Sequence, residues 1–399
     1  MLHQLLVGVK KPFIKMVPVS TPHCVEGAGS VAKVGELCQQ YRVSKPLIVT
    51  DNALVSLGIA QKVISSLQRS SIPFAMYDDV VPDPNFDVVR EGVNVYCEHQ
   101  CDGIIALGGG SPMDCAKAIA ASVRTGKDVA RLTGLFRVHR PLMPIIAIPT
   151  TAGTGSETTA AAVVSDEVAR KKLAIADPFL VPKVAILDAE LMIGLPVRVT
   201  AETGIDALTH AIESYLSGYA NSYTKALSIG AIQAILEYLP KAVENGSDIQ
   251  AREKMAKASF DAGVAFTRTY IGYVHAIAHQ LGAFYHVPHG QANAIVLPQV
   301  LRFIAEQNPV RLRELAAHFC DDIALEPQSD IVSQFIEKIE MLLRSLGIAS
   351  TVKELQEYDI ADIAKQAIGE AFGEYPVPVV MSNKQCQELL VKLLPNGEH

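Results

Sequence analysis

The sequence predicts a two-domain protein in which an N-terminal α/β domain is followed by an all-helical C-terminal domain. Three observations support this prediction: the length, an alternation of strand-like and helical stretches in the first half, and the loss of strand-like runs in the second. A chain of 399 residues exceeds the roughly 250–300 residues that a single hydrophobic core can serve. We expect one domain over residues 1–195 and the other over residues 196–399.

Short apolar, β-branched runs in the first half predict the strands of the α/β domain. Helical patterns separate them, for example over residues 85–100 and 112–123. This alternation is typical of an open, mostly parallel, Rossmann-like sheet with helices on both faces. The predicted strands lie at residues 46–50, 74–77, 103–107, 144–148 and 184–187.

Beyond Pro196 the pattern becomes helical throughout. Long stretches rich in Ala, Leu, Glu and Lys lie at residues 223–242, 250–265 and 330–346, and such residues favour helices. Because no Gly/Ser-rich linker separates the halves, we expect the two domains to pack tightly around a cleft.

Composition and charge exclude several classes of protein. Hydrophobic residues make up 49% of the chain and charged residues 19%, which excludes a disordered protein. With a formal net charge of −7 and no run of Lys or Arg, nucleic acid is not an expected partner. No apolar stretch reaches the ~18 residues of a membrane span, so a membrane is not expected either. Seven scattered cysteines without a CxxC pair favour a reducing, cytoplasmic location.

Three segments directly after predicted strands suggest a nucleotide site. The Gly-Gly-Gly-Ser segment Gly108–Ser111 precedes a helix, and the backbone N–H groups of a helix start suit a phosphate; an ordinary tight turn is the alternative. The loop Pro149–Glu157 is rich in hydroxyl groups, which can bind a ligand or cap a helix. Asp51 follows the predicted strand over residues 46–50. It therefore lies at the carboxyl edge of the sheet, where α/β proteins bind ligands.

A further glycine motif carries less weight. Gly27–Ala32 matches G-x-G-x-x-A, and Asp51 lies 22 residues after Gly29, close to the spacing of a dinucleotide-binding unit. The preceding residues 23–26 make a poor strand, however. We therefore favour the start of the first helix over a pyrophosphate loop for this motif.

One carboxylate and several histidines predict a metal site in the second domain. Asp206 and His210 are four residues apart in a helical stretch, so both side chains point the same way. Four more histidines follow at positions 275, 279, 286 and 289. Together they suit Fe²⁺ or Zn²⁺, although for any single histidine a surface or core role is the simpler interpretation. The signatures of zincin proteases, α/β-hydrolases and P-loop enzymes are absent.

In these motifs the chain resembles the iron-containing (group III) alcohol dehydrogenases, most clearly between residues 46 and 300. The segments that carry the resemblance are Gly108–Lys117, Pro149–Glu157, Gly204–Glu213 and His275–Ala294. The resemblance implies a nucleotide-binding domain followed by a metal-binding domain, with the active site between them, in a homodimer. It also implies hydride transfer between NAD(H) and a small primary alcohol or aldehyde.

The same resemblance implies roles for individual residues. The metal ligands would be Asp206, His210, His275 and His289. The contacts to NAD would be Asp51, Gly109, Gly110, Ser111, Asp114, Thr150, Thr151 and Lys172. His279 would lie near the nicotinamide and the substrate, where it could relay a proton, and Asp51 would favour NAD over NADP.

Other functions stay open at this point. A non-redox metalloenzyme of the dehydroquinate-synthase type shares the architecture, and a metal hydrolase or a metal-stabilised binding protein could use similar residues. NADH formation with a panel of alcohols would separate these from a dehydrogenase.

The segment before His275 departs from the family pattern. Many relatives read Phe-Ser-Asn-Ala-Gly-Leu-Gly, whereas this chain reads Phe-Thr-Arg-Thr-Tyr-Ile-Gly over residues 266–272. We interpret Phe266, Tyr270 and Tyr273 as one helix face that lines the substrate pocket, with packing between helices as an equally weighted alternative. The pocket interpretation predicts a preference for short, unbranched primary alcohols.

Overall fold

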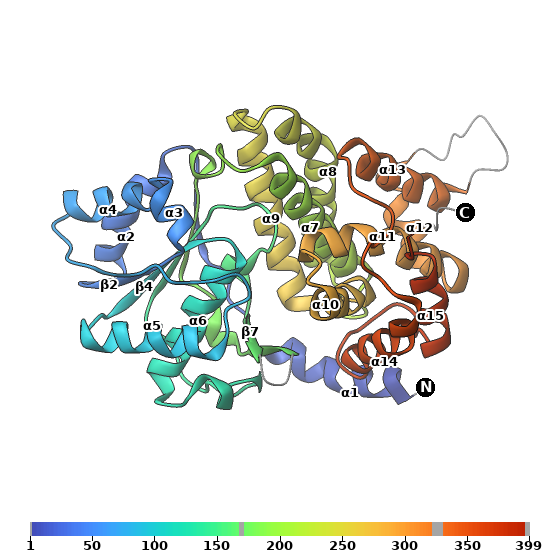
Figure 1. Ribbon diagram of the computed structural model, residues 1–399, viewed down its shortest axis with the longest axis horizontal. Helices are drawn as coiled ribbons and strands as arrows, with labels where there is room; N and C mark the ends of the chain where they lie inside the picture. Colours follow the sequence, from blue (N-terminus) through green and yellow to red (C-terminus); the bar gives the residue numbers. More distant parts are fainter. Residues whose placement is uncertain (1, 167–170, 321–329, 396–399) are drawn as a thin grey trace. The chain divides into compact units, whose positions relative to one another are not determined.

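The computed structural model describes residues 2–166, 171–320 and 330–395 (Figure 1). Its contacts divide the chain into two units. One, the sheet unit, contains Pro18–Leu195 and Gly246–Thr267. The other, the helical unit, contains Met1–Val17, Pro196–Asn245 and Arg268–His399.

These units differ from the predicted division into two continuous domains over residues 1–195 and 196–399. The first 17 residues group with the helical unit, and residues 246–267 group with the sheet unit. The physical reason is that hydrophobic periodicity predicts the type of an element but not the neighbours against which its apolar face packs.

The sheet unit is built on six parallel strands in the order β1-β9-β6-β4-β2-β3. Their bounds are β1 His23–Glu26, β2 Pro46–Val49, β3 Ala75–Tyr77, β4 Gly103–Gly108, β6 Ile145–Pro149 and β9 Val184–Leu187. The mostly parallel α/β sheet is thus confirmed. The prediction that residues 23–26 make a poor strand was wrong: they form the edge strand β1, aligned by the backbone of β9, and strand formation depends strongly on such context.

The carboxyl ends of the central strands meet at one edge of the sheet. Val49 pairs with Ala106, and Gly108 pairs with Pro149, so the segments after β2, β4 and β6 all leave from this edge. The chain continues from β2 to β3 on one side and from β4 to β6 on the other. Such a switch point is where open α/β sheets bind their ligands.

Helices cover both faces of this sheet. The helices of the unit are α2 Val34–Gln40, α3 Asn52–Ser56, α4 Ile59–Arg69, α5 Phe86–Glu98, α6 Gly110–Thr125 and most of α9 Ile249–Thr269. Figure 1 shows α5 and α6 on one face and α2 and α4 on the other. Because strand side chains alternate between faces, the apolar residues of each strand pack against helices on both faces of the sheet.

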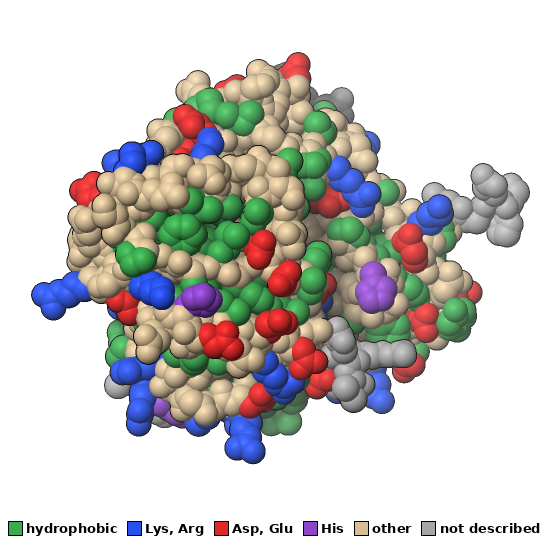
Figure 2. Space-filling model, turned by 60° about the vertical axis from the view of Figure 1, so that its left-hand side comes forward, with side chains coloured by type: hydrophobic (Ala, Val, Ile, Leu, Met, Phe, Trp, Pro, Cys, Tyr) green, Lys and Arg blue, Asp and Glu red, His purple; other side chains and the backbone are tan. Residues whose placement is uncertain are grey.

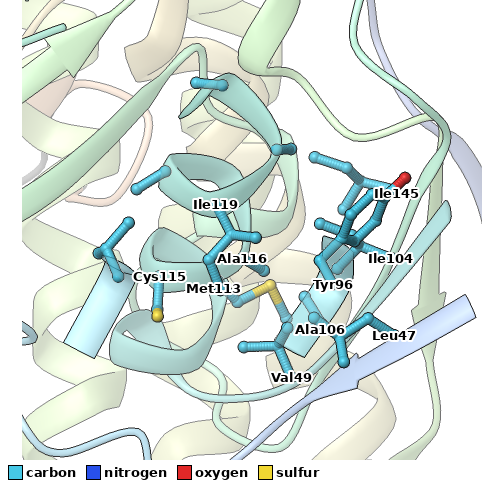
Figure 3. Packing of buried hydrophobic residues seen from close by; sticks show 14 of the residues in the cluster. Leu47, Val49, Tyr96, Ile104, Ala106, Met113, Cys115, Ala116, Ile119 and Ile145 are labelled. Carbon is cyan, nitrogen blue, oxygen red and sulfur yellow. The ribbon is translucent and has the colours of Figure 1, made fainter. Parts of the chain in front are cut away.

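Two apolar clusters fill the space between these layers. On the α6 face, Leu47 and Val49 belong to one cluster with Met113 and Ile119 of that helix (Figure 3). On the opposite face, alternate strand residues such as Ile48 pack with residues of α2 and α4. The buried strands hold the edge that carries the candidate nucleotide segments.

A small second sheet belongs to the same unit. Its strands are β5 Gly134–Leu135, β7 Ala161–Asp166 and β8 Lys171–Ala176, in the order β5-β8-β7. The pair β7–β8 is antiparallel and was not among the predicted strands.

The described residues of the helical unit contain helices and no β-strand, which confirms the all-helical prediction for this part of the chain. The α-helices are α1 Leu2–Met16, α7 Val197–Leu216, α8 Ser222–Glu244, α10 Tyr273–Tyr285, α11 His289–Gln307, α12 Val310–Ala316, α13 Ile331–Ser345, α14 Ile360–Ala371 and α15 Asn383–Val391. Across the part of the chain that the structure describes, no helix has the length and apolar character of a membrane span. Figure 2 shows acidic and basic side chains interspersed on one face of the molecule.

Candidate metal centre and cofactor segments

One face of α7 carries three buried ionisable side chains. Asp206, His210 and Glu213 are 2%, 5% and 8% exposed. Their spacing of four and then three residues places them one above the other along the helix. Glu213 was not predicted as a functional residue, although its position at i+7 from Asp206 is a signal that the sequence contains.

Two further histidines reach the same point from other helices. His275 lies in the first turn of α10, and His289 is the first residue of α11. The Oδ1 atom of Asp206 lies 3.9 Å from His210 Nδ1, 3.5 Å from His275 Nε2 and 3.5 Å from His289 Nε2. The structure therefore brings together all four residues predicted as metal ligands.

The environment of His275 tests whether this cluster fits a metal. Its Nδ1 lies 2.7 Å from Glu213 Oε2, and Glu213 also accepts hydrogen bonds from the backbone N–H groups of Gly272 and Val274. A carboxylate so bonded is an acceptor, so Nδ1 carries the proton and Nε2 offers a lone pair. Within the described residues, Nε2 is buried and makes no hydrogen bond, as a metal ligand would require.

The charges of the cluster agree with a cation site. Burial raises the pKa of Asp206, but His210, His289 and His275 outweigh this effect and hold the pKa far below its usual value. Burial lowers the pKa of His275, yet the carboxylates of Asp206 and Glu213 raise it to about 9, so without a metal the ring also holds a proton on Nε2, which a bound cation would displace. A buried carboxylate surrounded by imidazoles thus attracts positive charge, and one oxygen with three nitrogens is a donor set that suits Fe²⁺ or Zn²⁺.

Asn293 joins this cluster from the second turn of α11. It is fully buried, and its Nδ2 donates to Asp206 Oδ1 at 2.8 Å and lies 3.2 Å from His289 Nε2. It was not predicted, although it lies one helical turn after His289. Asn293 fixes the carboxylate of Asp206 relative to α11.

His279 lies one turn after His275 on α10 but has a different partner. Its Nδ1 lies 2.7 Å from Oε1 of Glu370, and its ring stacks on His289 at a centroid distance of 5.3 Å. His279 thus lies beside the four clustered residues, in ring contact with His275 and His289, and its Nδ1 is bonded to Glu370. No sequence signal pointed to Glu370, which is 91 residues further along the chain.

The aromatic segment before His275 is not one helix face. Helix α9 ends at Thr269 and α10 begins at Tyr273, with Tyr270 between them at φ +62°. The Tyr270 ring packs edge-on against the Tyr219 ring, with 5.9 Å between the ring centroids. Tyr273 is 3% exposed, and its hydroxyl accepts a hydrogen bond from the N–H of Met381. The single-face prediction was therefore wrong, and both tyrosines pack against other parts of the helical unit.

The absence of side chains at Gly108, Gly109 and Gly110 would let a ligand approach the backbone of this segment closely. Gly108 has φ +147°, and a Cβ there would lie 2.5 Å from Pro112 Cγ. Gly109 caps α6 without a side chain, so the start of this 16-residue helix is left open to a ligand. Gly110, the first residue of α6, would bring a Cβ to 3.0 Å from Thr154.

The polar segment after β6 lies against these glycines. The N–H of Thr150 donates to Gly108 O at 3.0 Å, and a Cβ on Gly109 would lie 3.3 Å from Thr151 Oγ1. On the other side, Ser111 Oγ accepts from the N–H of Asp83. The structure thus brings Gly109, Gly110, Ser111, Thr150 and Thr151 together at the carboxyl edge of the sheet.

Three other predicted cofactor contacts already have protein partners. Asp51 caps α3 and accepts from the N–H of Leu54 at 2.9 Å. Lys172 Nζ lies 2.7 Å from Asp83 Oδ1, beside the Ser111 contact. Asp114 accepts from Ser156 Oγ and from the N–H of Val163, so its carboxylate connects α6 to β7.

A buried lysine that was not predicted as a site residue belongs to the same network. Lys117 is 1% exposed, and its Nζ donates to Ser156 Oγ, Thr159 Oγ1 and Ala161 O. Three acceptors for three ammonium protons, with Asp114 bonded to the same serine, allow the charge to be buried. Lys117 therefore ties α6 to the end of the polar segment.

The weaker glycine motif does not offer a phosphate site. The N–H groups of Gly29 and Val31 donate to the two carboxylate oxygens of Asp188, and residues 30–33 form a short 3-10 helix before α2. This agrees with the interpretation of Gly27–Ala32 as the start of the first helix.

Together, these features define a class of protein that combines a parallel nucleotide-type sheet with a helical unit holding a buried Asp/His cluster. Comparison with known families supports this class. Residues 21–189 match the family described as iron-containing alcohol dehydrogenase, and residues 200–394 match the C-terminal part of the Fe-containing alcohol dehydrogenase family.

Individual relatives agree with this match. The chain is 39% identical over 348 residues to the NAD-dependent methanol dehydrogenase of Bacillus methanolicus and 40% identical over 352 residues to the 1,3-propanediol dehydrogenase of Klebsiella pneumoniae, covering 87% of this chain and 91% of each relative. A solved structure of 1,3-propanediol oxidoreductase superposes with a TM-score of 0.90 at 37% identity, covering 95% of this chain and all of that one. The chain belongs to the iron-containing alcohol dehydrogenase family and is an alcohol/aldehyde oxidoreductase of that family.

Proposed function

We propose that the protein transfers hydride between NAD(H) and a small primary alcohol or aldehyde, with Fe²⁺ or Zn²⁺ at the Asp/His cluster. The observation that carries the proposal is the approach of three histidine nitrogens to within 3.5–3.9 Å of one buried carboxylate oxygen, Asp206 Oδ1. The relatives support it, because they include an NAD-dependent methanol dehydrogenase and a propanediol dehydrogenase.

The proposed metal ligands are Asp206, His210, His275 and His289. A bound divalent metal supplies Lewis-acid polarisation of the alcohol or carbonyl oxygen, and the nicotinamide supplies the hydride chemistry. Glu213 holds the His275 ring so that Nε2 faces Asp206, and Asn293 fixes Asp206 itself. These two partners set the direction of the donor atoms before any ligand binds.

The proposed cofactor contacts lie on the sheet unit. Gly109, Gly110 and Ser111 present the start of α6 to the pyrophosphate. Thr150 and Thr151 lie against these glycines and offer hydroxyl groups. Lys172 pairs with Asp83, whose N–H donates to Ser111 Oγ, and this lysine would leave the carboxylate to contact NAD. Asp114 holds Ser156 and β7, because its two carboxylate oxygens accept hydrogen bonds from Ser156 Oγ and from the N–H of Val163. A direct contact between Asp114 and NAD would use one of these same oxygens.

Asp51 is the proposed determinant of NAD preference. It lies at the carboxyl end of β2, and its carboxylate can accept hydrogen bonds from a ribose and repel the 2′-phosphate of NADP. The N-terminal cap of α3 fixes this carboxylate in place.

His279 is the proposed proton carrier. Its Nδ1 is occupied by Glu370, so Nε2 is the nitrogen available to accept the proton that the alcohol loses, or to return it to the alcohol formed from an aldehyde. The side chain is 24% exposed, which allows exchange of that proton with solvent.

A homodimer and a cytoplasmic location are further parts of the proposal. The family resemblance supports the dimer. All seven cysteines lie in the described part of the chain and are free thiols, as in proteins of a reducing compartment.

The test is metal analysis of anaerobically purified protein together with NADH formation from a panel of alcohols. We expect about one divalent ion per chain and turnover with short primary alcohols. The variant His275→Ala should lose both the metal and the activity. Full activity and metal content in that variant, or a metal-loaded wild type that reduces NAD with none of the alcohols, would contradict the proposal.

A further inference from the structure

Glu370 bonds two neighbouring residues of α10 from a helix far along the sequence. Its Oε1 lies 2.7 Å from His279 Nδ1, and its Oε2 accepts from Gln280 Nε2 at 2.8 Å. Tyr375, in the segment after α14, donates its hydroxyl to the same Oε1 at 2.6 Å. Both carboxylate oxygens of Glu370 are therefore engaged, and the side chain has one fixed orientation.

We propose that Glu370, held by Tyr375 and Gln280, is a positioning residue for His279. It fixes the proton on Nδ1 and orients the ring, so that Nε2 is presented for proton transfer. The inference rests on the proposed function of His279 but assigns new roles to residues of the C-terminal segment.

The bonding pattern decides the tautomer. An ionised carboxylate can only accept hydrogen bonds, so His279 must donate from Nδ1, and its second nitrogen is left as the base. Burial raises the pKa of Glu370, but His279 and Tyr375 outweigh burial and lower it overall. Glu370 is thus ionised in the same arrangement that makes Nδ1 a donor.

The ring of His279 is placed beside the proposed metal ligands. It stacks on His289 with an interplanar angle of 20° and meets His275 edge-on at a centroid distance of 6.0 Å. If the ring turned over, Cδ2 would take the place of Nδ1 and the hydrogen bond to Glu370 would be lost. Glu370 also disfavours the other tautomer, because a lone pair on Nδ1 would then face a carboxylate.

The segment that holds Tyr375 is itself anchored. The N–H of Gly373 donates to His3 Nδ1 at 3.1 Å, and Lys10 Nζ donates to Gly373 O at 2.9 Å. Both partners lie on α1, outside the residues that match the family. Helix α1 therefore holds the backbone two residues before Tyr375, and the Tyr375 hydroxyl itself bonds Glu370 on α14.

The test compares Glu370→Gln and Tyr375→Phe with a matched control in the metal-loaded enzyme. The control is Tyr285→Phe, because Tyr285 also donates its hydroxyl to a carboxylate, that of Asp359 just before α14. We expect kcat to fall about 10–100-fold in Glu370→Gln, and by a smaller factor in Tyr375→Phe, as is common when a partner of a functional histidine is lost. Metal content and the KM for NAD should not change, and Tyr285→Phe should keep the wild-type kcat.

A double-mutant cycle separates positioning from general damage. In a His279→Ala background, Glu370→Gln should lower kcat no further, because residues that act through one group are not additive. An equal loss with and without His279 would overturn the proposal, and so would wild-type kcat in both Glu370→Gln and Tyr375→Phe.

A spectroscopic readout is independent of turnover. In Zn²⁺-loaded protein with ¹⁵N-labelled histidine, His279 should show a protonated Nδ1 in the wild type and a loss of that single form in Glu370→Gln. An unchanged spectrum in the variant would overturn the positioning role. If the wild type reduces NAD with no alcohol, the proposed function fails, and this spectrum still decides the role of Glu370.

Discussion

The carboxylate of Glu213 lies 2.7 Å from Nδ1 of His275 while also accepting the N–H groups of Gly272 and Val274. One side chain on α7 thereby fixes both the first turn of α10 and the orientation of the histidine within it. Glu213 therefore links the start of α10 to the proposed metal site, and a change in either should affect the other.

The first prediction concerns Glu213 itself. Glu213→Gln should weaken metal binding about 10–100-fold, because a neutral amide oxygen is a weaker acceptor for the Nδ1–H of His275 than a carboxylate. Metal affinity measured by competition with a chelator checks this. The control is Glu202→Gln on the same helix, because Glu202 pairs with the exposed Arg198. This variant should bind the metal with unchanged affinity. Equal affinities in all three proteins would contradict the role of Glu213.

The second prediction concerns Gly272, which has no room for a side chain. A Cβ there would lie 2.7 Å from Glu213 Oε1, and the carboxylate cannot move without losing its three donors. Gly272→Ala should therefore lower the free energy of unfolding by about 1–3 kcal/mol and weaken metal binding as well. In Gly282→Ala, within α10, the nearest atom to the added Cβ is 3.6 Å away, so that variant should bind metal normally. Denaturant unfolding with and without metal distinguishes the two.

The sequence predicted what depends on local spacing. Buried strands such as Pro46–Val49 and the pair Asp206 and His210 follow from short-range patterns, because one strand or one helix turn relates the residues concerned. By contrast, Glu370 meets His279 through tertiary packing across 91 residues, and no periodicity records such a contact.

The helix break at residues 270–272 was not predicted, because it too depends on a contact between distant parts of the chain. Glu213 takes up the N–H groups of Gly272 and Val274, so a partner on another helix sets the start of α10. The apolar and aromatic residues on either side would also fit one continuous helix, and the sequence alone therefore gave a single face where the structure has two helices.

The third prediction follows from the packing of Tyr273. Its hydroxyl accepts from the buried N–H of Met381 at 2.9 Å, so Tyr273→Phe leaves that N–H without its partner. The free energy of unfolding should fall by about 1–3 kcal/mol, while the ranking of alcohols in the activity panel should stay the same. A changed ranking without loss of stability would restore a pocket role for this residue.

The fourth prediction uses the helix-cap position of Asp51 and its proposed role in NAD preference. Asp51→Asn keeps a good helix cap but removes the negative charge that would repel a 2′-phosphate. We expect the ratio of kcat/KM for NAD to that for NADP to fall at least several-fold at unchanged stability. The control is Asp102→Asn at the opposite, amino edge of the same strands, where Asp102 accepts from the N–H groups of Ser44 and Lys45. A wild type that already prefers NADP would show that Asp51 is misassigned.

The last prediction concerns removal of the metal. Asp206, His210 and His275 are all buried, and their ligand atoms lie within 4.8 Å of one another. A cation that binds this arrangement only in the folded protein should stabilise it by RT ln(1 + [M]/Kd), about 2.7 kcal/mol at one hundred times the Kd. Chelation should therefore lower the melting temperature of the wild type, and added Fe²⁺ or Zn²⁺ should restore it in a concentration-dependent way. His210→Ala should lose this response, whereas Glu202→Gln should keep it. If the wild type and His210→Ala respond equally to the metal, the stabilising ion binds elsewhere and the Asp/His cluster is not its site.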